Sequence, residues 1–204
     1  MKKYLPINTK TFGFVEREKQ KGRYVHNKCG RDFFYYCLNY YFPNRFNPKH
    51  LNHLEIEEKR LFGFKISSYM AWTMLQFIKI AKFLKSNGLS LEINSKKINS
   101  FPSFILAILT PNRRSSSLAI KEIERAIDNK QACGIDITLG YLLLNHVMFV
   151  YGYDKDNLYV FDTHPEELLE YKKMTKDKRF IMKLPKSVIK KHWSMFGRVW
   201  AIKP

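Results

Sequence analysis

The amino-acid sequence predicts an α+β fold, in which helices come first along the chain and an antiparallel sheet follows. Two observations carry this prediction. Apolar residues recur at helical spacing in segments up to Ile127, and after Asn129-Lys130 the pattern changes to that of strands. The 204 residues, with 45% hydrophobic and 15% aromatic content, are also enough to bury one sizeable core. We therefore expect a single domain spanning residues 1–204.

The expected domain has three parts. Residues 1–27 form an extended segment, because prolines and glycines interrupt any helix there. Residues 28–115 are mainly helical, and residues 116–204 contain one helix followed by the sheet.

The first helix is expected from about Gly30 to Tyr41, where Pro43 follows and stops it. Asp32 in its first turn suits the positive end of the helix dipole. Its apolar face consists of Phe33, Phe34, Cys37, Leu38 and Tyr41.

Spacing, caps and turns predict the remaining elements. The helical segments are a short helix around Leu54–Leu61, an amphipathic helix from a Ser67 or Ser68 cap to Asn87-Gly88, a short helix or turn over Phe104–Leu109, and a helix capped by Ser117 after a surface loop at Asn112–Ser117. The strands are Leu89–Ile93, Ala132–Leu139, His146–Tyr153, Asn157–Asp162, Arg179–Leu184 and Val199–Lys203. The turn Asp154-Lys155-Asp156 joins the two middle strands.

The formal net charge of +18 would attract anionic partners. The basic residues gather at Arg17–Arg23, Lys96-Lys97, Arg113-Arg114, Lys172–Arg179 and Lys186–Lys191. These clusters are scattered along the chain, and no nucleic-acid recognition motif accompanies them. We therefore attribute the charge to composition, and keep nucleic acid or an anionic membrane surface as an alternative that we do not favour.

The three cysteines are expected to be reduced thiols. Cys29 and Cys37 lie two turns apart on one predicted helix, so about 12 Å separates their Cα atoms, which is beyond disulfide reach. The motif His50-x-x-His53 has no second pair of ligands at zinc-finger spacing. We predict neither a metal site nor a cofactor.

No segment has the pattern of a secretory signal or a membrane span. The first eight residues carry positive charge without an apolar run behind them. The most apolar stretch, Ile66–Leu84, is interrupted by Gln76, Lys79 and Lys82 at helical spacing. We expect a cytoplasmic protein, and the sequence does not address export without a signal.

Three residues form a candidate catalytic set. Cys29 stands at the beginning of the first predicted helix, where the dipole would favour a thiolate. His146 opens one strand of the predicted hairpin, and Asp162 ends its partner strand. A thiol, an imidazole and a carboxylate in these places are the components of nucleophilic acyl transfer. Packing roles are the alternative for each residue, and His164 is a competing base.

The same residues carry a resemblance to a known family. The hairpin from His146 through Gly152-Tyr153-Asp154 to Asp162 resembles the histidine hairpin of the papain-fold cysteine peptidases that process double-glycine bacteriocin leaders. Cys29-Gly30 is similar to the nucleophile dipeptide of that family. The resemblance implies a papain-like cysteine protease fold, with Cys29, His146 and Asp162 as its catalytic triad.

Two features differ from the family. Its peptidases place a glutamine, the oxyanion donor, about six residues before the nucleophile, where this chain has Arg23. Gln20 and Asn27 are the remaining candidates for that donor. Bulky aromatic residues also replace the small residues that follow the nucleophile dipeptide in the family.

The function expected from these residues is that of a papain-like cysteine hydrolase, a peptidase or amidase that forms a thioester intermediate. Its substrate would be a peptide or amide, and the basic clusters would suit an acidic one. Two alternatives stay open: a thiol acyltransferase or transglutaminase-like enzyme, and a non-catalytic papain-like binding domain with a basic surface. The sequence does not choose a substrate or an oligomeric state.

Overall fold

The computed structural model describes most of the predicted elements of this chain. The described residues are 1–9, 12, 19–20, 23–24, 29–47, 51, 60–61, 64–65, 74–100, 102–103, 106–107, 115–139, 144–162, 181–193 and 197–204. Within them the fold is α+β, as predicted, with four helices and an eight-stranded antiparallel sheet.

The sheet joins strands from both ends of the chain. Its path runs in the order β11, β10, β9, β8, β12, β6, β7, and β1 pairs with β9 beside this path. The strands are β1 Lys3–Tyr4, β6 Ser90–Ile93, β7 Lys96–Ile98, β8 Ala132–Leu139, β9 Leu144–Tyr153, β10 Asn157–Phe161, β11 Ile181–Pro185 and β12 Arg198–Lys203. Two short hairpins lie outside this sheet, β2 Lys19–Gln20 with β3 Arg23–Tyr24, and β4 Arg60–Leu61 with β5 Phe64–Lys65.

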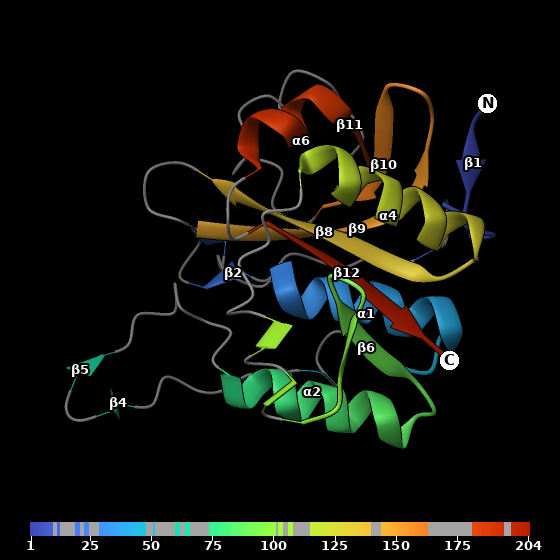
Figure 1. The fold of residues 1–204 in the computed structure, drawn as a ribbon. Helices are drawn as coiled ribbons and strands as arrows, with labels where there is room; N and C mark the ends of the chain where they lie inside the picture. Colours follow the sequence, from blue (N-terminus) through green and yellow to red (C-terminus); the bar gives the residue numbers. More distant parts are fainter. Residues whose placement is uncertain are drawn as a thin grey trace.

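The helices lie on both faces of the sheet. Figure 1 shows α4 and α6 on one face of the central strands and α1 on the other, with α2 farther from the sheet centre than α1. Their bounds are α1 Cys29–Tyr41, α2 Met74–Ser86, α4 Ser116–Asp128 and α6 Lys186–His192. Among the described residues, no helix combines the length and apolar character that crossing a membrane requires.

The first helix follows its predicted bounds because its apolar face is broad. Phe33, Tyr36, Cys37 and Leu38 are all buried. The end of α2 is also as predicted, since Gly88 has φ +73°, a conformation that glycine adopts without strain.

The structure corrects two predicted boundaries. The cap of α4 is Ser115 rather than Ser117, and its side-chain oxygen accepts a hydrogen bond from the Leu118 amide. Three consecutive serines offer three possible caps, so the pattern alone could not select one. The C-terminal end of the predicted short helix around Leu54–Leu61 is wrong, because Arg60–Leu61 forms strand β4 and pairs with Phe64–Lys65. The rest of that helix, and the predicted Ser67 or Ser68 cap, lie outside the described residues.

Among the elements that were not predicted are β1, α6 and β7. β1 has two residues and α6 has seven, so neither shows a hydrophobic period. β7 follows a two-residue turn in which Asn94 and Ser95 both have positive φ, and its two lysines gave it the pattern of a charged loop.

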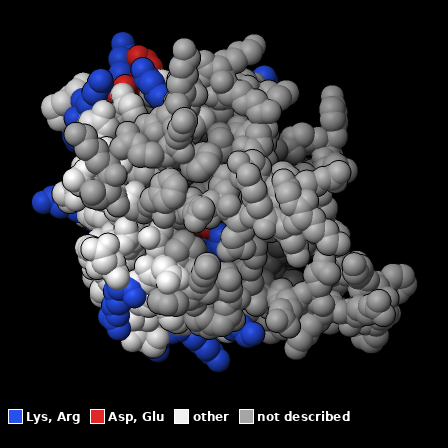
Figure 2. Space-filling view, turned by 180° about the vertical axis from the view of Figure 1, so that it is seen from behind, with Lys and Arg blue, Asp and Glu red and all other residues white. Residues whose placement is uncertain are grey.

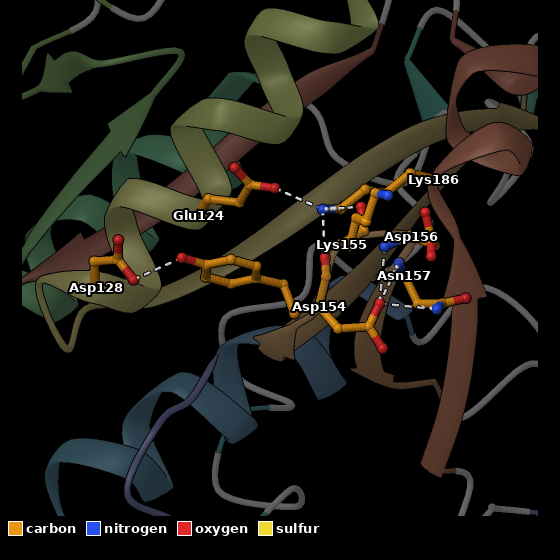
Figure 3. A network of polar contacts seen from close by, with 8 residues as sticks. Glu124, Asp128, Asp154, Lys155, Asp156, Asn157 and Lys186 are labelled. Carbon is orange, nitrogen blue, oxygen red and sulfur yellow. Dashed lines mark hydrogen bonds and ion pairs between the residues drawn. The ribbon is translucent and has the colours of Figure 1, made fainter. Parts of the chain in front are cut away.

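A polar network fixes α6 and the β9–β10 turn to α4. Lys186 Nζ donates to Glu124 Oε1 at 2.6 Å and to the carbonyl oxygen of Asp154 at 2.6 Å (Figure 3). Tyr153 donates to Asp128 Oδ1 at 2.8 Å, and Lys3 binds the same oxygen at 2.9 Å. This network therefore joins β1, α4, the β9–β10 hairpin and α6.

Candidate functional site

The most distinctive polar contact in the core joins His146 to Asp162. His146 belongs to β9, and Asp162 follows the last residue of β10, the antiparallel neighbour of β9. His146 Nε2 lies 2.9 Å from Asp162 Oδ2, and the two side chains are 0% and 1% exposed. The chain turns back at the β9–β10 hairpin, which brings together two residues that are 16 positions apart. The contact fixes the orientation of the imidazole, because Nε2 faces the carboxylate.

The hairpin turn that sets this register is itself well fixed. Asp154 Oδ1 accepts hydrogen bonds from the amides of Asp156 and Asn157, and Oδ2 accepts one from the Tyr159 hydroxyl. These bonds hold the pKa of Asp154 well below its ordinary range, with the bond from Tyr159 the largest cause. Asp154 and Asp156 are thus turn residues, as predicted.

Cys29 is the first residue of α1 and is only partly buried. The helix packs against β9, the strand that carries His146. In Figure 1 the first turn of α1 and the beginning of β9 lie at the same end of the molecule. No hydrogen bond joins Cys29 to His146 or Asp162 among the described residues. The structure therefore pairs the imidazole with the carboxylate and places the thiol at the same end of the fold.

The other two thiols are enclosed in the core. Cys37 and Cys133 are each 0% exposed, and burial raises the pKa of both well above the ordinary value. A thiol that is buried and protonated does not react as a nucleophile. Cys29 is consequently the one cysteine of the chain with exposed surface.

Two ion pairs near this end of the fold were not predicted. Arg31 and Asp32, in the first turn of α1, lie 2.9 Å apart, with side chains 2% and 4% exposed. Arg198 of β12 and Asp136 of β8 lie 3.7 Å apart. A single charged residue, Asp136, in the segment Ala132–Leu139 was the available signal, because a buried strand seldom contains an unpaired carboxylate.

Burial raises the pKa of Asp136 more than the neighbouring groups lower it. Desolvation raises the pKa of Asp136 to about 6, while the charges of Arg198 and His146 and the nearby Trp200 indole lower it in part. The effect of His146 on this pKa shows that Asp136 and the His146–Asp162 pair belong to the same electrostatic environment.

Of the other candidate residues, one is described by the structure and the rest lie outside the described residues. Gln20 is in β2, where its backbone pairs with that of Arg23. Asn27, His164, His50 and His53 lie outside the described residues. Within the described part, no group of three or more His, Cys, Asp and Glu side chains is arranged to hold a metal ion.

The basic clusters are described only in part as well. Lys96-Lys97 and Lys186–Lys191 are described, whereas Arg113-Arg114 and Lys172–Arg179 are not. Figure 2 shows lysine and arginine at several separate places on the described part of one face.

Protein-family models, curated proteins and solved structures were each compared with this chain, and none of them matches it. A functional proposal therefore rests on the fold and on the geometry of the described residues.

Proposed function

We propose that this chain is a papain-like cysteine hydrolase, a peptidase or amidase, with Cys29 as nucleophile, His146 as general base and Asp162 as the residue that orients the imidazole. The contact between His146 Nε2 and Asp162 Oδ2, buried near the beginning of β9, is the observation that carries the proposal. A carboxylate on one ring nitrogen directs the other nitrogen, Nδ1, to proton transfer.

The proposed reaction begins with transfer of the Cys29 proton to His146 Nδ1. The thiolate attacks the acyl carbonyl, the amine leaves with the proton from the imidazolium, and a thioester remains on Cys29. Water, deprotonated by His146, then releases the acid. The Cys29 amide, with Gln20 or Asn27, would bind the oxyanion, and each such donor contributes about 3 kcal/mol.

The first test is alkylation by iodoacetamide at pH 6, followed residue by residue with mass spectrometry. We expect Cys29 to be modified first, because Cys37 and Cys133 are enclosed in the core and His146 would take up the Cys29 proton. The substitution His146→Ala should slow modification of Cys29 at least tenfold. The control His192→Ala changes a histidine on α6 and should leave the rate unchanged.

The second test asks for acyl transfer. With p-nitrophenyl acetate, a burst of nitrophenolate and an acetyl group on Cys29 would indicate a thioester intermediate, and Cys29→Ala should abolish both. Hydroxylamine should release the acetyl group from Cys29 as a hydroxamate, which identifies the bond as a thioester. If Cys29 reacts no faster than the unfolded chain and no burst occurs, the hydrolase proposal is overturned in favour of the non-catalytic binding domain, the alternative that Arg23 in place of the family's glutamine favours.

A further inference from the structure

The structure has a second charged pair near the first turn of α1, and its position follows from the packing of that helix. At one end of the helix, the Tyr41 hydroxyl donates to the Ile202 carbonyl and accepts from the Ala132 amide. Farther along, Phe33 packs against Trp200, and a Cβ atom on Gly134 would lie 2.3 Å from the Phe33 ring. The helix thus runs along β8 and β12 toward the positions that follow Gly134 and precede Trp200.

Asp136 and Arg198 occupy these positions. In the β8–β12 register, Arg198 is opposite Asp136 and Trp200 is opposite Gly134. Residues two apart on a strand point to the same face. Asp136 and Arg198 therefore face α1, under the helical turn that begins with Cys29.

The two members of this pair differ in exposure and are incompletely satisfied. The Arg198 side chain is 16% exposed and that of Asp136 is 5% exposed. Their 3.7 Å contact is too long for a hydrogen bond, and Arg198 forms no other ion pair among the described residues. Asp136 Oδ1 has no hydrogen-bond partner in the described part of the chain. The guanidinium group therefore retains donors for a ligand, while the carboxylate stands behind it.

We infer that Arg198 is a specificity-determining residue that binds a carboxylate of the substrate, and that the charge of Asp136 behind the guanidinium limits this attraction. The inference rests on the proposed function and gives it a substrate class, an acyl compound with an acidic group close to the bond that is broken. Arginine suits this role because its planar donors match the two oxygens of a carboxylate. The Arg31–Asp32 pair is a poorer candidate, since Arg31 is almost fully enclosed.

The test compares two alkylating reagents that differ in charge. Iodoacetate and iodoacetamide react with Cys29 by the same displacement, in which the Cys29 sulfur bonds to the CH2 carbon and iodide leaves. Only iodoacetate carries a carboxylate. The readout is the rate constant for iodoacetate at Cys29 divided by that for iodoacetamide. This ratio is then divided by the same ratio for N-acetylcysteine. We expect this normalised ratio to be about 10, the effect of one favourable charge pair of about 1.4 kcal/mol.

Two substitutions should move the ratio in opposite directions. Arg198→Gln removes the cation and should return the ratio to about 1 with little change for iodoacetamide. Asp136→Asn removes the neutralising charge and should raise the ratio. The controls Arg125→Gln and Asp156→Asn make the same changes in net charge at exposed positions and should have no effect. Loss of local structure would alter both reagents together, so it would not reproduce this pattern.

The outcomes separate this inference from the proposed function. A ratio near 1 that Arg198→Gln leaves unchanged overturns the role of Arg198, even if Cys29 is rapidly alkylated at pH 6. A slow Cys29 that still shows the expected ratios supports the anion site and overturns only the proposed hydrolase.

Discussion

Gly134 of β8 and Phe33 of α1 are in such close contact that no side chain larger than hydrogen fits between the helix and the strand. A Cβ atom on Gly134 would lie 2.3 Å from Cε2 of Phe33 and 2.6 Å from the carbonyl oxygen of Met148. Since the carbonyl belongs to the sheet backbone, neither side of the contact can yield without moving the helix or the strand.

Gly134→Ala should therefore lower the free energy of unfolding by about 3 kcal/mol, in the range that overpacking of a core causes. Urea denaturation followed by circular dichroism measures the change. Gly88→Ala is the comparison, because that glycine has open space around it but φ +73°, and it should cost about 1 kcal/mol. Equal losses from both substitutions would show that α1 does not sit this close to β8.

The pH dependence of stability should identify Asp136. Its pKa is about 6 in the folded chain and has the ordinary value of 3.8 when unfolded. Between these values the folded state binds more protons, so the stability that the protonated form provides is present below about pH 4 and is lost as the pH rises through 6.

Asp136→Asn should remove this loss, because an amide does not titrate in this range. The stability of the variant relative to the native chain should therefore rise by about 3 kcal/mol between pH 4 and pH 7. Unfolding curves at several pH values test this, with Asp156→Asn in an exposed turn as the control. Parallel pH profiles for Asp136→Asn and the native chain would contradict the raised pKa.

Lys186 should matter to stability more than the other lysines of α6. Its ammonium group contacts Glu124, Asp154 and Lys155, whereas Lys190 is exposed on the same helix. Lys186→Met leaves these acceptors without their donor, so we expect the free energy of unfolding to fall by about 1 kcal/mol. Lys190→Met should change it by less than about 0.5 kcal/mol. A greater effect of Lys190→Met would show that the network in Figure 3 does not anchor α6.

The sequence was most informative where periodicity extends over many residues. Helix α1 and strands β8, β9 and β10 were predicted within about two residues, because long apolar faces leave few alternatives. The His146–Asp162 contact could be anticipated since both residues flank one hairpin with a recognisable turn. The Asp136–Arg198 pair could not, because it joins strands far apart in the sequence, and only the sheet order makes them neighbours.

The final prediction separates a structural role of Asp162 from a catalytic one. Asp162→Ala leaves the buried imidazole of His146 without this acceptor, so the free energy of unfolding should fall by about 1–3 kcal/mol. Asp162→Asn retains an oxygen at this place and should cost less. If Asp162 also orients the catalytic base, both substitutions should slow alkylation of Cys29 by iodoacetamide at pH 6, even in samples shown by circular dichroism to be folded. Reduced stability with unchanged Cys29 reactivity would make the pair a core contact alone, and the catalytic role of Asp162 would have to be abandoned.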